Sequence, residues 1–247
     1  MPELKNIDQL PAKARERVSQ YTRKLLDLHG ENIESILVYG SAASPNFQPG
    51  VSNVNIAVIV RSLDFGVLQK SLKLSAWGNK RGFPAPLFLT RGYINTSVDV
   101  FPIEYSEIKE SHIVIFGPDI FADLVVDVRH VRLFCEEQVK GKLLRLRQSY
   151  LDSQANPKLL RNLLIDSLNS LIPVFRQLVR LTGVQPAVEK DELLRQLAAR
   201  FSINTEAFLA VHLDKNRPVP LNRALLHTHL KDYLHQLQQL ADHIDHL

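Results

Sequence analysis

Ile36-Leu37-Val38-Tyr39-Gly40-Ser41 and, after a short loop, Ser52-Asn53-Val54-Asn55-Ile56 are the two stretches that decide the fold. The first is apolar and rich in residues that favour strands until it reaches the glycine. The loop over 42–50 holds two prolines and a second glycine, and an apolar run over 54–60 follows it. The pattern predicts two strands joined by this loop.

Gly40 and Ser41 stand at the point where the first of these strands ends. Glycine lets a backbone approach a phosphate closely, and the turn offers N–H groups and a hydroxyl to phosphate oxygens. A Gly-Ser turn is common, however, so its meaning depends on the residues that follow.

Asn53 and Asn55 are two residues apart at the start of the second strand. Alternate residues of a strand leave the same face, so both side chains can converge on one point. In a phosphoryl-transfer site such a pair would be aspartates, because two hard cations need anionic oxygens. Here both positions are amides.

The rest of the first half reads as a mixed α/β unit. A helix is expected from Pro11 to His29, with Gly30 ending it, and another over 64–80. Thr90 can cap a single helical turn. Three further strands are predicted at 86–89, 100–108 and 113–116.

From about Arg129 onward the apolar residues follow a helical period and no strand is predicted. We therefore expect an α+β protein with two domains, an α/β domain over 1–125 and an all-α helical bundle domain over 126–247. Helices are predicted at 129–152, 157–182, 189–200, 204–213 and 221–246.

The last predicted helix carries a regular apolar seam whose spacing alternates between four and three residues. Its members are Leu226, Leu230, Tyr233, Leu237, Leu240, Ile244 and Leu247. Two interpretations stay open: a bundle helix packed on its own domain, or a homodimer interface through 226–247. The histidines of this region lack the spacing of a metal site.

Composition gives an ordinary globular protein, with 45% hydrophobic and 23% charged residues. The single Cys135 excludes an intramolecular disulfide framework and favours a cytoplasmic protein, and no apolar run is long enough to span a membrane. The net charge of +4 arises in the second half, where 129–161 holds eight basic and three acidic residues. This excess is compatible with an anionic ligand near this segment, but a solvated helix face is the interpretation that we prefer. Nucleic acid is not an expected partner.

The layout resembles the nucleotidyltransferase fold of the DNA polymerase beta superfamily, in the branch of the aminoglycoside nucleotidyltransferases. The resemblance is carried by Gly40, Ser41, Gly50, Ser52 and the pair Asn53 and Asn55. It implies a nucleotidyltransferase-type mixed sheet with flanking helices and a helical domain behind it. It also implies an NTP as ligand or substrate, bound through Gly40, Ser41 and Ser52, with Mg²⁺ held at 53, 55 and a third carboxylate.

Glu104, as the middle of an apolar-acid-apolar strand, is the favoured third carboxylate, and Asp99 is its competitor. In relatives that modify aminoglycosides, an acid of the helical domain can activate the acceptor hydroxyl. Glu136 or Glu137 would take that role here.

Several charged residues of the first C-terminal helix have alternative interpretations. Arg132, Glu136 and Lys140 are also spaced as an intrahelical charge ladder. Lys142 and Arg145 are candidates to reach the phosphates of a nucleotide.

Two amides in place of two carboxylates remove most of the field that holds two Mg²⁺ ions. We therefore expect a catalytically degenerate protein that binds a nucleotide and acts as a regulator or assembly partner. One alternative is an active enzyme that moves NMP from an NTP to a hydroxyl of a small molecule. A second is a non-enzymatic dimeric scaffold.

Overall fold

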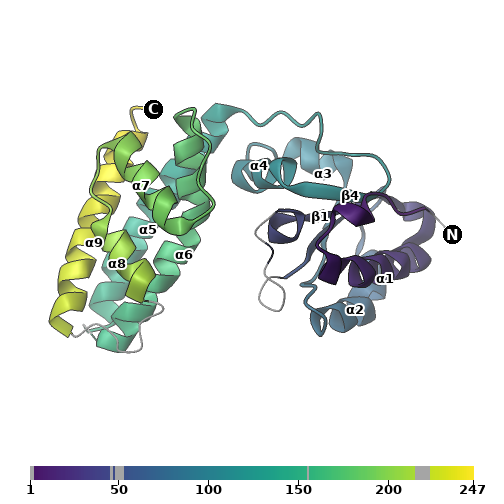
Figure 1. The fold of residues 1–247 in the computed structure, drawn as a ribbon, viewed down its shortest axis with the longest axis horizontal. Helices are drawn as coiled ribbons and strands as arrows, with labels where there is room; N and C mark the ends of the chain where they lie inside the picture. The colour runs from purple at the N-terminus through teal and green to yellow at the C-terminus, as the bar shows by residue number, and fades with distance from the viewer. Residues whose placement is uncertain (1–2, 45–46, 48–52, 155, 215–222) are drawn as a thin grey trace. The chain divides into compact units, whose positions relative to one another are not determined.

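The computed structural model describes residues 3–44, 47, 53–154, 156–214 and 223–247, without the side chains of 223–225. Gly50 and Ser52 lie outside the described residues. The chain forms two compact units, Met1–Val126 and Asp127–Leu247 (Figure 1).

The first unit is built on a four-stranded mixed sheet with the order β3-β2-β1-β4. Strand β1 pairs antiparallel with β2 and β4, and β2 pairs parallel with β3. The strands are β1 (Ile33–Tyr39), β2 (Asn55–Val60), β3 (Leu87–Leu89) and β4 (His112–Phe116).

Helices cover both faces of this sheet. The side chains of Ile36 and Val38 face the core formed with α1 (Ala12–His29) and α2 (Phe65–Asn79). Leu37 faces the opposite core, formed with α3 (Arg91–Thr96) and α4 (Pro102–Glu110). Short 3-10 turns complete the unit at Ile7–Gln9 (η1), Gly30–Asn32 (η2) and Gly40–Ala43 (η3).

Local signals fix several helix ends where the sequence predicts them. Helix α1 ends at Gly30, which has a φ of 51°. Asp64 caps α2 by accepting a hydrogen bond from the amide of Val67, and Thr90 caps α3 in the same way through Tyr93.

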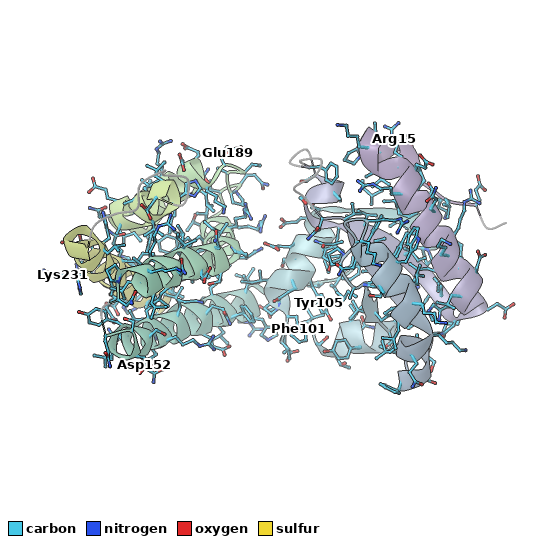
Figure 2. All side chains as sticks on the ribbon, turned by 90° about the horizontal axis from the view of Figure 1, so that it is seen from below. Arg15, Phe101, Tyr105, Asp152, Glu189 and Lys231 are labelled. Carbon is cyan, nitrogen blue, oxygen red and sulfur yellow. The ribbon has the colours of Figure 1, made fainter. Side chains whose placement is uncertain are left out.

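The strand predicted over 100–108 is wrong, because α4 occupies this segment. Pro102 takes a first-turn position, and Tyr105 and Ile108 share the face that packs on the sheet. The buried hydroxyl of Tyr105 lies 2.8 Å from Ser97 Oγ, and its ring contacts Phe101 edge-on (Figure 2). Tertiary packing therefore makes this segment a helix, although its apolar residues alternate as they would in a strand.

The second unit is entirely helical in its described residues. Its helices are α5 (Val128–Asp152), α6 (Pro157–Leu181), α7 (Lys190–Phe201), α8 (Glu206–Asp214) and α9 (Arg223–Ile244). Asn156 caps α6 by accepting from two backbone amides, and Gly183, with a φ of 78°, follows its end.

The apolar seam of α9 lies inside its own bundle. All its members except Leu247 are buried, and α9 packs on α5, α6 and α8. This is the first of the two interpretations of the seam. A homodimer through 226–247 would have to use the exposed face of α9 and not the buried seam, and it stays a prediction.

Two further features concern the helices and the single cysteine. Among the described helices, none is long and apolar enough to cross a membrane. Cys135 is buried on α5, and burial raises the pKa of its thiol to about 12. The thiol therefore stays protonated and unreactive at neutral pH.

Gly117 provides a test of this packing. It has a φ of 78°, and a Cβ at this position would lie 2.1 Å from the carbonyl oxygen of Glu34. We expect Gly117→Ala to lower the free energy of unfolding by about 3 kcal/mol or more, because backbone cannot move aside as a side chain can. Urea midpoints followed by circular dichroism would measure the loss.

Gly82→Ala is the matched control in the same unit. Gly82 has a φ of 80°, but a Cβ there would meet only an Arg17 nitrogen at 3.8 Å. Its cost should be the backbone strain alone, about 1–2 kcal/mol. Equal losses for the two variants would contradict the close approach of Gly117 to Glu34.

Candidate functional site

The turn after β1 is held in place by Ser111, the residue before β4. The amide of Gly40 donates to the carbonyl of Ser111 at 3.1 Å, and Ser111 Oγ donates back to the carbonyl of Gly40 at 3.4 Å. The carbonyl of Ser41 accepts from the amide and the hydroxyl of Ser44. The amide of Ser41 is left without an acceptor inside the turn, as the first amides of any helical turn are.

Asn55 lies directly beside this turn. It pairs with Tyr39 across the sheet, and a Cβ at Gly40 would approach Asn55 Nδ2 to 3.2 Å. Gly40 also has a φ of 74°, a conformation that side chains other than glycine rarely adopt. The backbone torsion of residue 40 and the small space beside Asn55 therefore both favour glycine at this position.

Asn53 precedes β2 by two residues and is exposed, whereas Asn55 is half-buried. Asn55, Tyr39 and His112 form a row across three strands, because Tyr39 pairs with both of the others. Burial raises the pKa of Tyr39, so its hydroxyl stays protonated at neutral pH and can donate a hydrogen bond.

His112 and Asp119 complete this edge of the sheet, and the sequence analysis missed both. His112 Nδ1 donates to the carbonyl of Ile108 at 2.8 Å, and Nε2 lies 3.0 Å from Asp119 Oδ2. The other oxygen of Asp119 accepts from the amides of Phe121 and Ala122. Both nitrogens of the imidazole are thus engaged, so the ring is not free to act as a general base.

The two candidates for a third carboxylate do not stand on a strand. Glu104 lies exposed in the first turn of α4, and Asp99 lies exposed in the turn before it. Strand β3 offers Leu87 and Leu89 on the face that Asn55 shares. Within the described part of the chain, no three His, Cys, Asp or Glu side chains are grouped so that they could hold a metal.

The helical unit holds the remaining candidates on α5. Glu136 accepts hydrogen bonds from Arg132 at 3.0 Å and from Lys140 at 2.7 Å, so it is part of the charge ladder. Lys140 also binds Asp245 near the end of the chain. Glu137 is exposed on the same helix.

Lys142 and Arg145 lie further along α5, Lys142 half-buried and Arg145 exposed. Burial lowers the pKa of Lys142, and the neighbouring charge of Arg145 lowers it further, against the opposing effect of Asp166. These residues belong to a different unit from Gly40 and Asn55. Their role in binding a nucleotide stays a prediction.

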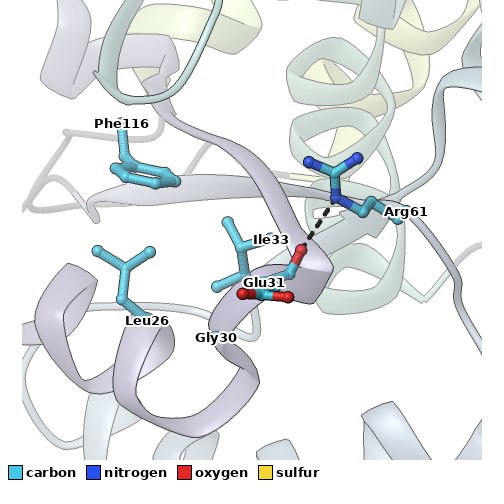
Figure 3. Close-up of a pocket in the computed structure, with 6 residues that line it drawn as sticks. All are labelled: Leu26, Gly30, Glu31, Ile33, Arg61 and Phe116. Atoms are coloured by element: carbon cyan, nitrogen blue, oxygen red, sulfur yellow. Dashed lines mark hydrogen bonds between the residues drawn. The ribbon is translucent and has the colours of Figure 1, made fainter. Parts of the chain in front are cut away.

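Two cavities of the first unit lie near the sheet. One, of about 430 Å³, borders the turn on the side of α1 and is lined by Ala42, Ala43, Ser44 and Phe47. The other, of about 730 Å³, lies at the opposite end of the sheet from Gly40 (Figure 3). In it, Arg61 Nε donates to the carbonyl of Glu31, and Phe116 lies across from Leu26.

No protein-family model matches this chain, and no curated protein matches it. Solved structures do match. One is spectinomycin adenyltransferase AAD(9) from Enterococcus faecialis, solved with ATP and spectinomycin. It is 14% identical, with a TM-score of 0.56, and the match covers 90% of this chain and 99% of that one. At this identity the similarity shows the fold: the chain has a nucleotidyltransferase-like fold followed by a helical region.

Proposed function

We propose that this protein binds a nucleotide at the edge of the sheet formed by Gly40, Ser41 and Asn55, without two-metal catalysis, and acts as a regulator or assembly partner. The observation that carries the proposal is the glycine turn beside Asn55, the amide that the resemblance aligns with a metal-binding carboxylate. The structural neighbour was solved with ATP, which supports a nucleotide as the ligand class.

Replacing carboxylates by amides changes how this edge meets a phosphate. A carboxylate only accepts hydrogen bonds, so it repels phosphate oxygens unless a cation lies between them. An asparagine also carries two N–H donors, and the amide of Ser41 and the hydroxyl of Tyr39 add further donors. Such an edge can bind phosphate oxygens directly.

The same replacement argues against catalysis by two Mg²⁺ ions. These ions need anionic ligands to bridge them. Asn53 and Asn55 bring no charge, and Asp119 is engaged by His112 and two backbone amides.

An active transferase is the second candidate, favoured by the neighbour's complex with ATP and spectinomycin. Such an enzyme would use Glu104 or Asp99 with one metal ion. Glu136 would have to break its ion pairs with Arg132 and Lys140 to act as a base. A non-enzymatic dimeric scaffold is the third candidate, and a protein that stays monomeric in light scattering at high concentration would eliminate it.

The first prediction concerns nucleotide affinity. Isothermal titration calorimetry should show that ATP binds in EDTA at least as tightly as it does in excess Mg²⁺, because the site offers donors and its one carboxylate, Asp119, is already bound by His112 and two backbone amides. Gly40→Ala should weaken binding by about tenfold or more, since the new methyl group displaces Asn55. Gly82→Ala is the control and should leave the affinity unchanged. Absence of heat with any nucleotide in either condition would refute the proposal.

The second prediction restores the missing charge. The double variant Asn53→Asp and Asn55→Asp should lose ATP affinity in EDTA through repulsion and regain it when Mg²⁺ is added. The matched control is Asn79→Asp with Asn95→Asp, which adds the same charge outside the site. If the site variant gains no dependence on Mg²⁺, the placement of these amides beside the phosphates is incorrect.

The third prediction separates the degenerate protein from an active enzyme. Incubation with labelled ATP and a panel of hydroxylated acceptors should give the same background with wild-type protein and with Glu104→Gln. A labelled product that depends on Glu104 would establish the second candidate and reject the first.

A further inference from the structure

A groove of about 450 Å³ lies between α5 and α9 within the helical unit. Its floor is apolar, formed by Leu230 and Leu234, and Tyr150 and His227 form one wall. The Tyr150 and His227 rings meet edge to face at 5.8 Å, and the hydroxyl of Tyr150 lies 3.4 Å from His227 Nδ1. The volume falls within the range of small-molecule sites, about 300–1,000 Å³.

The groove is lined by two cations, Arg147 and Lys231, and by the imidazole rings of His227 and His235. No carboxylate is among its described lining residues. Arg147 donates to the neutral amide oxygen of Gln238 at 3.1 Å. Lys231 lines the groove from α9, and its side chain is exposed (Figure 2). The nearest acid along α5, Asp152, does not line the groove.

The other end of the same helix pair shows the opposite arrangement. There Lys140 of α5 binds Glu136 at 2.7 Å and Asp245, which follows α9, at 2.7 Å. Arg132 binds Glu136 and also the carbonyl of Ile244. The α5 and α9 interface thus neutralises its cations at one end and leaves them facing a cavity at the other. Two cations that face one groove with no carboxylate among its described lining residues attract an anion to it.

We propose that this groove binds a small phosphorylated molecule with an aromatic or apolar body. The phosphate would lie between Arg147 and Lys231, since a guanidinium and an ammonium are the side chains that bind phosphate most strongly. The body would lie on Leu230 and Leu234 beside the ring of Tyr150. The groove's volume of about 450 Å³ favours a small molecule over a nucleic acid strand.

The groove belongs to a different unit from the turn at Gly40. Phenyl phosphate carries the proposed phosphate and aromatic ring, and variants of the groove residues separate its binding here from any binding at the sheet edge. Calorimetry should show binding that salt weakens, and Arg147→Gln with Lys231→Gln should reduce the affinity by about tenfold or more. The matched control, Lys158→Gln with Arg200→Gln, removes the same charge from exposed positions of the same unit and should bind as wild type.

Histidine ring signals in NMR give a second measurement that locates the ligand. The signals of His227 and His235, assigned with single glutamine variants, should shift on titration while the signal of His29 stays fixed. Unchanged circular dichroism melting shows that the groove variants remain folded.

Three results would overturn the proposal. One is the absence of binding at millimolar phenyl phosphate. A second is equal weakening by the groove variant and its control, which would mean attraction to net charge alone. The third is binding of a single-stranded oligonucleotide with no binding of phenyl phosphate, which would assign the groove to nucleic acid.

Discussion

Strand β1 is the element on which the first unit depends. It is hydrogen-bonded along both edges and buried on both faces, with Ile36 and Val38 against one core and Leu37 against the other. Its register cannot slip by one residue, because a slip would exchange the two faces. The position of β1 therefore fixes where Gly40 falls, which residue lies beside Asn55, and which residue of β4 completes the row.

The helical part of the fold could be predicted from the sequence because its signals are local. Asn156, Pro157 and Gly183 mark helix ends by their own chemistry, and a period of 3.6 residues is visible in any one helix. The local pattern of the α4 segment, in contrast, predicts the wrong structure. Phe101, Ile103 and Tyr105 alternate as in a strand, and only contacts with Ser97 and the sheet make the segment helical.

The candidate site was predictable only in part, for the same reason. A period of two residues predicts that Asn53 and Asn55 share one face. Strand β2 begins only at Asn55, and Asn53 lies exposed before it, so the shared face stays a prediction. Ser111, His112 and Asp119 reach the same edge through the pairing of β4 with β1, which joins residues about seventy positions apart. No local sequence pattern predicts such a pairing.

Both proposed sites depend on donors and cations facing a phosphate without a metal ion. At the sheet edge the donors are amides and hydroxyls, which bind at short range and are little affected by salt. In the α5 and α9 groove they are full charges, which attract at longer range and are screened by salt. The ionic strength of the solution therefore separates the two sites experimentally.

The helical unit has its first helix, α5, packed against its last, α9. Arg132 donates a hydrogen bond to the carbonyl of Ile244, which lies 112 positions later in the sequence. The buried seam of α9 completes the core. During synthesis the chain emerges from its N-terminus, and the first unit can fold while the helical unit is still being made. Helices α5 to α8 must meanwhile leave apolar surface exposed until α9 leaves the ribosome. The nascent helical unit therefore exposes to solvent the apolar surface that α9 later covers.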